Sequence, residues 1–168
     1  MIDLPVIAKG LIGAINLKSK QIVTNPKNSI HFSCNITGRC CKRNQIPISE
    51  LEMRRITKHG YLDFVTDLPP IQTPDGLTYW MKRINGTCVF LKDNKCSIHT
   101  IKPFSCSLFP FQVVLTSESE WDVSVSETNI CDNIIETSQA NSINNEILHS
   151  ILKLVESYVN ELKAFKSS

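Results

Sequence analysis

Seven cysteines constrain this chain of 168 residues more than any other feature. They form two groups and one later residue: Cys34, Cys40 and Cys41, then Cys88, Cys96 and Cys106, and finally Cys131. An odd number leaves one thiol over in any framework built only of disulfides, and no secretory signal directs the chain to an oxidising compartment. We therefore predict that the cysteines ligate metal, in preference to the alternative that they are small buried apolar residues.

The composition is that of an ordinary globular protein. Hydrophobic residues make up 42% and charged residues 20% of the chain, which is long enough to bury a core without disulfides. We expect one domain over residues 1–168. A net charge of +2 supplies no strong overall field, so the composition disfavours a nucleic-acid partner, and it leaves protein partners open.

The first twenty residues contain an apolar run from Leu4 to Leu17 that Lys9 interrupts. The run is shorter than the about 20 apolar residues that span a bilayer, and no cleavage site follows it. We therefore expect a cytoplasmic protein without a membrane partner. The segment is predicted to be a packing helix that Pro5 begins and glycines weaken.

Local signals in the middle of the chain predict a helix followed by hairpins. Ser49 and Glu52 have the spacing of a capping box, and Gly60 can end the helix in a left-handed conformation. From residue 79 the pattern becomes extended, with tight turns at the dipeptides 85–86 (Asn-Gly) and 93–94 (Asp-Asn). A small antiparallel meander carrying Cys88 and Cys96 is expected.

The remainder of the chain predicts a proline-bounded turn, a second hairpin and a long helix. Pro103 can begin a helical turn and Pro110 can end it, which places Cys106 between two backbone constraints. Residues 111–117 and 121–126 alternate as paired strands do, and apolar residues recur at helical spacing over 142–165. The fold class is therefore α+β, with small hairpins, flanking helices, cysteine-bearing loops and an amphipathic C-terminal helix.

The cysteines lie at predicted element boundaries, as the ligands of a zinc site or an iron-sulfur cluster often do. Adjacent side chains such as Cys40 and Cys41 point to opposite faces of an extended segment, so one of them could serve another site. One complete four-sulfur site and a partial second site are possible. The second could be completed by water or by one of three side chains, namely His31, His99 and Asp132.

Basic residues crowd the vicinal cysteine pair. They are Arg39, Lys42 and Arg43. Positive charge would favour thiolates and offset the negative charge of a four-thiolate site. The alternative, that these residues belong to a solvated surface loop, remains open.

Together the runs FSCNITGRCC, IPISELEMRRI and CVFLKDNKCSIHTIKPFSCSLFPF resemble the YkgJ-type cysteine-cluster family, whose CxxCxxCC domain is described as zinc- or iron-chelating. The resemblance covers residues 32–111. It implies metal ligation by three cysteines of the family's opening block, three of its second block and one later cysteine. These are Cys34, Cys40, Cys41, Cys88, Cys96, Cys106 and Cys131.

Departures from the family pattern affect mainly its opening. Thr37 stands where the family has its second cysteine, which weakens any site that includes Cys34. Three smaller changes are Lys102 for arginine, His99 for tyrosine and Ser107 for arginine. We therefore expect the strongest ligands in the second block, joined by Cys40 or Cys41.

Two functions follow from this resemblance. The first is a metal-binding protein with an iron-sulfur cluster or zinc, whose role is structural, redox or metal handling. The second is a protein-modifying enzyme, because the flagellin lysine N-methylase contains a similar cysteine cluster. The chain has neither a glycine-rich nucleotide loop nor a CxxxCxxC radical motif, so the enzyme alternative depends on the resemblance alone. A nucleic-acid docking module and a thiol switch are weaker alternatives.

Overall fold

The computed structural model describes residues 10–25, 30–32, 41–42, 45–125, 134–136 and 140–168. The chain divides into two compact units. The first consists of Met1–Asn35 and Leu108–Val159, and the second of Ile36–Ser107 and Asn160–Ser168. Runs of antiparallel strands are separated by single helices in chain order, which confirms the predicted α+β class. The expectation of one domain over the whole chain stays a prediction.

The first unit is built around a four-stranded antiparallel sheet with the order β11-β12-β1-β2. Its strands are β1 (Leu11–Asn16), β2 (Ile22–Thr24), β11 (Phe111–Leu115) and β12 (Glu120–Val125). Strands β11 and β12 form the predicted second hairpin. A separate two-stranded ladder pairs β3 (Ile30–Phe32) with β13 (Ile134–Glu136).

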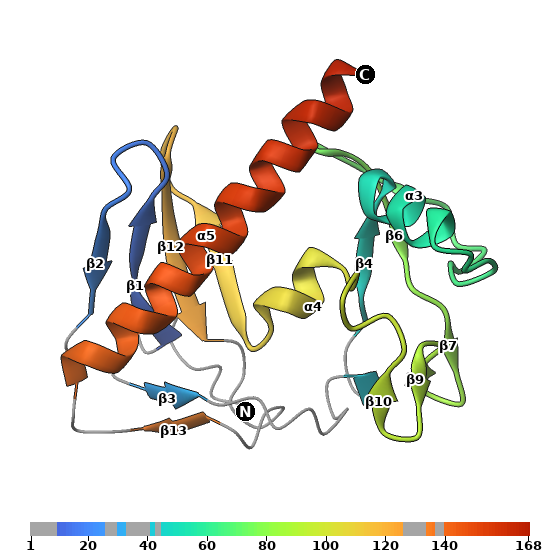
Figure 1. Ribbon diagram of the computed structural model, residues 1–168, viewed down its shortest axis with the longest axis horizontal. Coiled ribbons are helices and arrows are strands. Elements are labelled where there is room, and N and C mark those ends of the chain that lie inside the picture. Colours follow the sequence, from blue (N-terminus) through green and yellow to red (C-terminus); the bar gives the residue numbers. More distant parts are fainter. Residues whose placement is uncertain (1–9, 26–29, 33–40, 43–44, 126–133, 137–139) are drawn as a thin grey trace, which may run out of the picture. The chain divides into compact units, whose positions relative to one another are not determined.

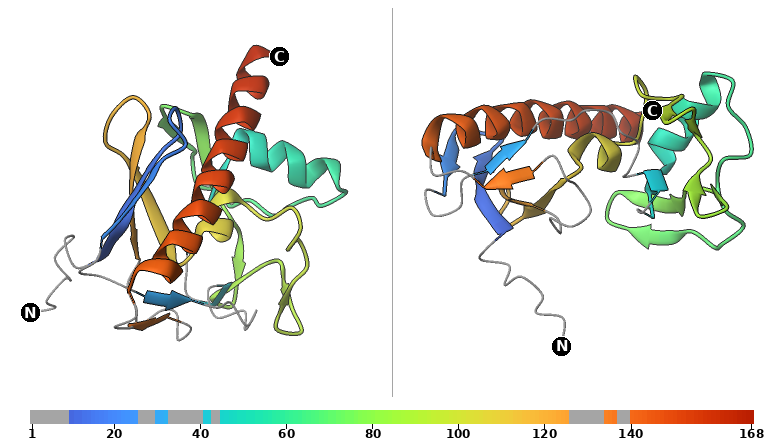
Figure 2. Two further views of the ribbon diagram at one scale, coloured as in Figure 1. Left: turned by 60° about the vertical axis from the view of Figure 1, so that its left-hand side comes forward. Right: turned by 90° about the horizontal axis from the view of Figure 1, so that it is seen from below.

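Helix α5 (Ala140–Ser167) lies along one face of the four-stranded sheet (Figures 1 and 2). Its buried residues in the first unit recur at helical spacing, which confirms the predicted apolar stripe. They are Leu148, Ile151, Leu152 and Val155. An ion pair between Lys20, in the turn after β1, and Glu156 adds a polar contact of α5 within this unit.

The helix predicted near the N-terminus is wrong for the part that the structure describes, because Leu11–Asn16 is strand β1. Residues 1–9, including Pro5, lie outside the described residues. Ile12 and Ile15 are fully buried, and β1 pairs with β12 on one side and β2 on the other. β-Branched residues and glycines have modest helix propensity, so pairing with the neighbouring β2 and with β12, from a distant part of the chain, decides the conformation.

Gly13 allows α5 to approach β1 closely. A Cβ atom at this position would lie 2.2 Å from the backbone oxygen of Val23 and 2.5 Å from Cδ1 of Leu148. We therefore expect Gly13→Ala to lower the free energy of unfolding by about 1–3 kcal/mol, because the sheet or helix must shift. Urea denaturation checks this value. Val23→Thr, at a position that is 65% exposed, is the control and should change stability by under about 0.5 kcal/mol; equal effects of the two variants would contradict the steric account.

The second unit contains a three-stranded antiparallel sheet and a capped helix. The sheet has the order β4-β6-β5, with β4 (Pro47–Ser49), β5 (Ile71–Thr73) and β6 (Gly76–Trp80). Helix α3 (Glu50–Lys58) begins after Ser49 with the predicted capping box to Glu52. Gly60 has a φ of 89°, so the predicted left-handed stop is confirmed.

Two short hairpins replace a continuous meander within the described residues. One joins β7 (Arg83–Ile84) to β8 (Thr87–Cys88), and the other joins β9 (Leu91–Lys92) to β10 (Lys95–Cys96). Both predicted turns have positive φ at their two central residues, at 51° and 75° in the first and at 50° and 58° in the second. This conformation matches the twist of a two-residue hairpin.

The second unit also contains most of α4 (Phe104–Leu108), up to Ser107, and the last residues of α5. Pro103 precedes α4, as predicted. Near the C-terminus, the guanidinium of Arg54 lies 5.0 Å from the ring centre of Phe165, and Arg55 pairs with Glu161 at 2.7 Å. These contacts attach the end of α5 to α3.

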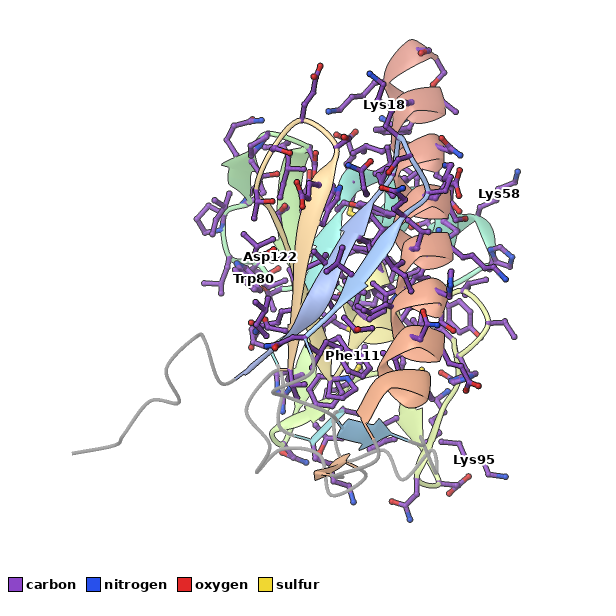
Figure 3. The ribbon with its side chains drawn as sticks, turned by 90° about the vertical axis from the view of Figure 1, so that its left-hand side faces the viewer. Lys18, Lys58, Trp80, Lys95, Phe111 and Asp122 are labelled. Carbon is purple, nitrogen blue, oxygen red and sulfur yellow. The ribbon has the colours of Figure 1, made fainter. Side chains whose placement is uncertain are left out.

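Charged side chains project from turns and helix ends, such as Lys18 after β1 and Lys58 at the end of α3 (Figure 3). Among the helical residues that the structure describes, no segment combines the length and the apolar character needed to cross a bilayer.

Candidate metal centre

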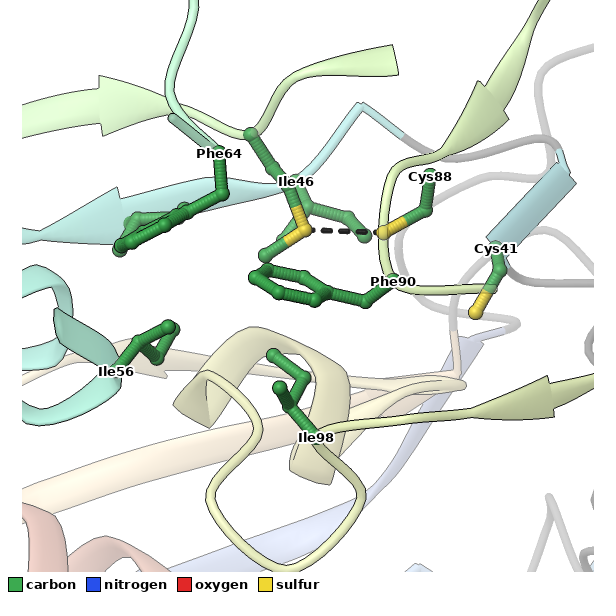
Figure 4. Packing of buried hydrophobic residues seen from close by; sticks show 9 residues of the cluster. Cys41, Ile46, Ile56, Phe64, Cys88, Phe90 and Ile98 are labelled. Atoms are coloured by element: carbon green, nitrogen blue, oxygen red, sulfur yellow. Dashed lines mark hydrogen bonds between the residues drawn. The ribbon is translucent and has the colours of Figure 1, made fainter. Parts of the chain in front are cut away.

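The four cysteines that the structure describes all belong to the second unit and gather at one hydrophobic cluster. Cys41 and Cys88 are members of the cluster, with exposures of 8% and 4%, and Cys96 and Cys106 pack against it. The other buried members are Ile46, Ile48, Ile56, Phe64, Met81, Phe90 and Ile98 (Figure 4). Thiols from distant parts of the sequence therefore share one largely dry environment.

Three of these cysteines are positioned by short, conformationally restricted elements. Cys88 ends β8 and Cys96 ends β10, so each follows a tight hairpin turn. Cys106 lies in the first turn of α4, which begins at Phe104 directly after Pro103. Because such elements have few backbone alternatives, they fix the direction from which each thiol approaches the cluster.

The thiol of Cys88 contacts a second sulfur atom. Its Sγ donates to Sδ of Met81 at 3.0 Å, shown as the dashed line in Figure 4. Phe90 lies beside this pair in the cluster and contacts Tyr61 edge-on, with ring centres 5.3 Å apart. The surroundings of Cys88 are thus polarisable and apolar, which suits soft sulfur chemistry and excludes water.

A buried carboxylate connects α3 to the helix that carries Cys106. Glu52 is 3% exposed and accepts hydrogen bonds through Oε2 from the backbone N–H and the hydroxyl of Ser49, both at 2.9 Å. Its Oε1 accepts from the backbone N–H of Phe104 at 2.5 Å. The capping box was predicted from sequence, but this second contact was not. The sequence shows only that Glu52 occupies a capping position. Nothing in the sequence identifies the backbone N–H of Phe104 as a second donor to its carboxylate.

Apart from His99, the remaining candidate ligands have side chains that lie outside the described residues. They are Cys34, Cys40, Cys131 and Asp132 together with the side chain of His31. The backbone of His31 is in β3, which ends shortly before Cys34 and pairs with β13. His99 is exposed and follows the β9–β10 hairpin.

The described residues alone do not make a complete metal site. No three His, Cys, Asp or Glu side chains among them lie close enough together to hold an ion. The donor chemistry nevertheless fits a soft metal, because four thiols border one cluster and sulfur ligands favour zinc and iron-sulfur centres. A metal here would need either a ligand from beyond the described residues or convergence of the thiols on binding.

Comparison with known families identifies the domain. The CxxCxxCC family model, described as "Putative zinc- or iron-chelating domain", matches residues 33–139. The chain belongs to this family. The match extends beyond the resemblance seen in the sequence and includes Cys131. No curated protein and no solved structure matches the chain.

Membership of the CxxCxxCC family supports metal binding as the general function and zinc or iron as its metal. The residues matched by the family model include all seven cysteines of the chain.

Proposed function

We propose that this CxxCxxCC domain holds an iron-sulfur cluster or a zinc ion through Cys88, Cys96 and Cys106, joined by Cys40 or Cys41. The observation that carries this proposal is the gathering of four described cysteines at one hydrophobic cluster. A common ligand would account for thiols from the segment of Cys41, two hairpins and a proline-bounded helix sharing one environment.

Zinc and an iron-sulfur cluster both require several thiolate ligands at one site. Zinc in a structural site takes four ligands in a tetrahedron, and an iron-sulfur cluster commonly takes four thiolates. Either would link elements that are short and make few backbone hydrogen bonds of their own, so metal binding would stabilise the second unit. The proposed role is accordingly structural, redox or metal handling.

Cys34 and Cys131 form the weaker part of the proposal. Both lie outside the described residues, and Cys34 belongs to the opening block that departs from the family pattern. We assign them to a partial second site, in which Thr37 leaves the family's second cysteine position without a thiol.

Anaerobic purification followed by elemental analysis and a visible absorption spectrum tests the proposal. Iron with inorganic sulfide and broad visible absorption would identify a cluster, whereas zinc in a colourless protein would identify a zinc site. We expect one of the two at no less than one site per chain. Protein that contains neither metal and takes up neither when reconstituted would contradict the proposal.

The alternative of a protein-modifying enzyme related to the flagellin lysine N-methylase is supported only by the resemblance of the cysteine cluster. Transfer of a labelled methyl group to lysine side chains of a protein substrate would support it. Retained metal without transfer would favour the binding protein.

A further inference from the structure

Arg83 connects the hairpin of Cys88 to the segment of Cys41. In the β7–β8 ladder Arg83 lies directly opposite Cys88, so the two side chains project from the same face of the hairpin. One terminal nitrogen of its guanidinium donates to the backbone oxygen of Lys42, next to Cys41, at 2.8 Å. The same nitrogen also donates to the backbone oxygen of Gly86 in the hairpin turn.

Lys42 extends this connection to the hairpin of Cys96. Its Nζ donates to Oδ1 of Asn94 at 3.4 Å, a longer and weaker contact. Asn94 lies in the left-handed turn between β9 and β10, and β10 ends at Cys96. Arg83, Lys42 and Asn94 are named the polar clasp below.

We propose that the polar clasp positions the three cysteine-bearing segments that it joins and that its two cations offset the charge of the thiolate site. This inference rests on the proposed metal-binding function. It assigns a role to residues beyond the ligands themselves. The clasp acts through the cysteines and is not proposed as a ligand set, because its guanidinium and ammonium groups have no lone pair to offer a metal and the amide oxygen of Asn94 accepts from Lys42.

The electrostatic part follows from the charge of the site. Four thiolates around a divalent ion leave a net negative charge, which is costly where Cys41 and Cys88 are buried. Arginine stays protonated at all ordinary pH values, and its interaction with a nearby anion strengthens as water is excluded. The permanent positive charge of Arg83, whose backbone lies opposite Cys88, therefore favours the metal-bound form of the site, in which the cysteines are thiolates.

The geometric part follows from the hydrogen bonds. A two-residue hairpin has little stability by itself, so its orientation depends on contacts with other segments. The bonds from Arg83 to the oxygens of Lys42 and Gly86 fix the hairpin against the segment of Cys41. Partners that orient metal ligands typically contribute about 10–100-fold to metal affinity.

The test compares Arg83→Gln and Arg83→Lys with the matched control Lys82→Gln. Lys82 is the adjacent cation, and its Nζ donates to Oδ1 of Asp63 at 2.8 Å, a hydrogen bond that raises the pKa of Lys82 above 10.5. Lys82 directly precedes β7, and its ammonium pairs with the Asp63 carboxylate, so Lys82 should not act on the thiolates. Each protein is titrated with a competing chelator, and melting of its metal-free form is measured separately.

We expect Arg83→Gln to weaken metal affinity by about tenfold. Arg83→Lys keeps the positive charge but loses the planar guanidinium and its hydrogen bonds. Its metal affinity should therefore lie between that of Arg83→Gln and that of the parent. Lys82→Gln should match the parent. For an iron-sulfur cluster, Arg83→Gln should also lower the reduction potential, because a removed cation no longer stabilises the more negative reduced form.

Two results would overturn the inference. The first is equal affinity of Arg83→Gln and Lys82→Gln. The second is a lower melting temperature of metal-free Arg83→Gln with unchanged metal affinity, because the clasp would then only stabilise the fold. Arg83→Lys as weak as Arg83→Gln would overturn the electrostatic part. A parent protein that binds no metal would contradict the proposed function itself, so the two failures are distinguishable.

Discussion

Cys88→Ser should remove most of the bound metal, and Cys96→Ser and Cys106→Ser should do the same. Altering a partner that only orients a ligand already costs about 10–100-fold in metal affinity, so loss of a ligand should cost more. Elemental analysis after anaerobic purification measures the metal content. Because the metal would link short elements, the melting temperature of the metal-loaded preparation should fall as well.

Two controls separate ligation from packing. Cys88→Ala keeps an apolar side chain in a position that is 4% exposed, and it should lose metal as completely as Cys88→Ser. Val123→Thr places a hydroxyl at a fully buried position of the first unit, so it should lower stability without lowering metal content. If all three cysteine-to-serine changes kept the parent's metal content and melting temperature, the ligand assignment would be wrong.

Glu52→Ala should lower the free energy of unfolding by about 3 kcal/mol. The change removes a buried acceptor of hydrogen bonds from Ser49 and Phe104, and leaving a buried donor without its acceptor costs about 1–3 kcal/mol. It also removes half of the capping box of α3. Urea denaturation of the metal-free protein measures the loss.

Glu50→Ala is the matched control, because Glu50 lies in the same helical turn. Its carboxylate pairs with Arg54 at 2.7 Å in an i, i+4 arrangement on the protein surface. Such exposed pairs contribute about 0.3–0.5 kcal/mol. A loss for Glu52→Ala no larger than that for Glu50→Ala would contradict the role of Glu52 in joining α3 to α4.

Features that depend on a few neighbouring residues were predictable from the sequence. The capping box of Ser49 and Glu52 and both hairpin turns are fixed by local backbone chemistry, and all appear where predicted. The long C-terminal helix was predictable because its apolar residues recur over many turns. The segment of β1 was not, because Ile12 and Ile15 are buried through pairing with β2 and with β12, and β12 comes from a distant part of the chain.

The same distinction holds for the site. Cysteine type and spacing predicted soft-metal chemistry, and the family match supports metal binding by the domain, whereas the ligand set stays a prediction. The contacts of Glu52 with Phe104 and of Arg83 with Lys42 could not be predicted. They join residues far apart in sequence through backbone groups, which carry no side-chain signature.

The central claim is that sulfur atoms of the second unit bind a metal directly. X-ray absorption at the edge of the metal found by elemental analysis measures the atoms around it. The account predicts a first shell dominated by sulfur, at about 2.3 Å if the metal is zinc, and loss of this shell in Cys88→Ala. A first shell of oxygen and nitrogen, or an unchanged sulfur shell in Cys88→Ala, would contradict it.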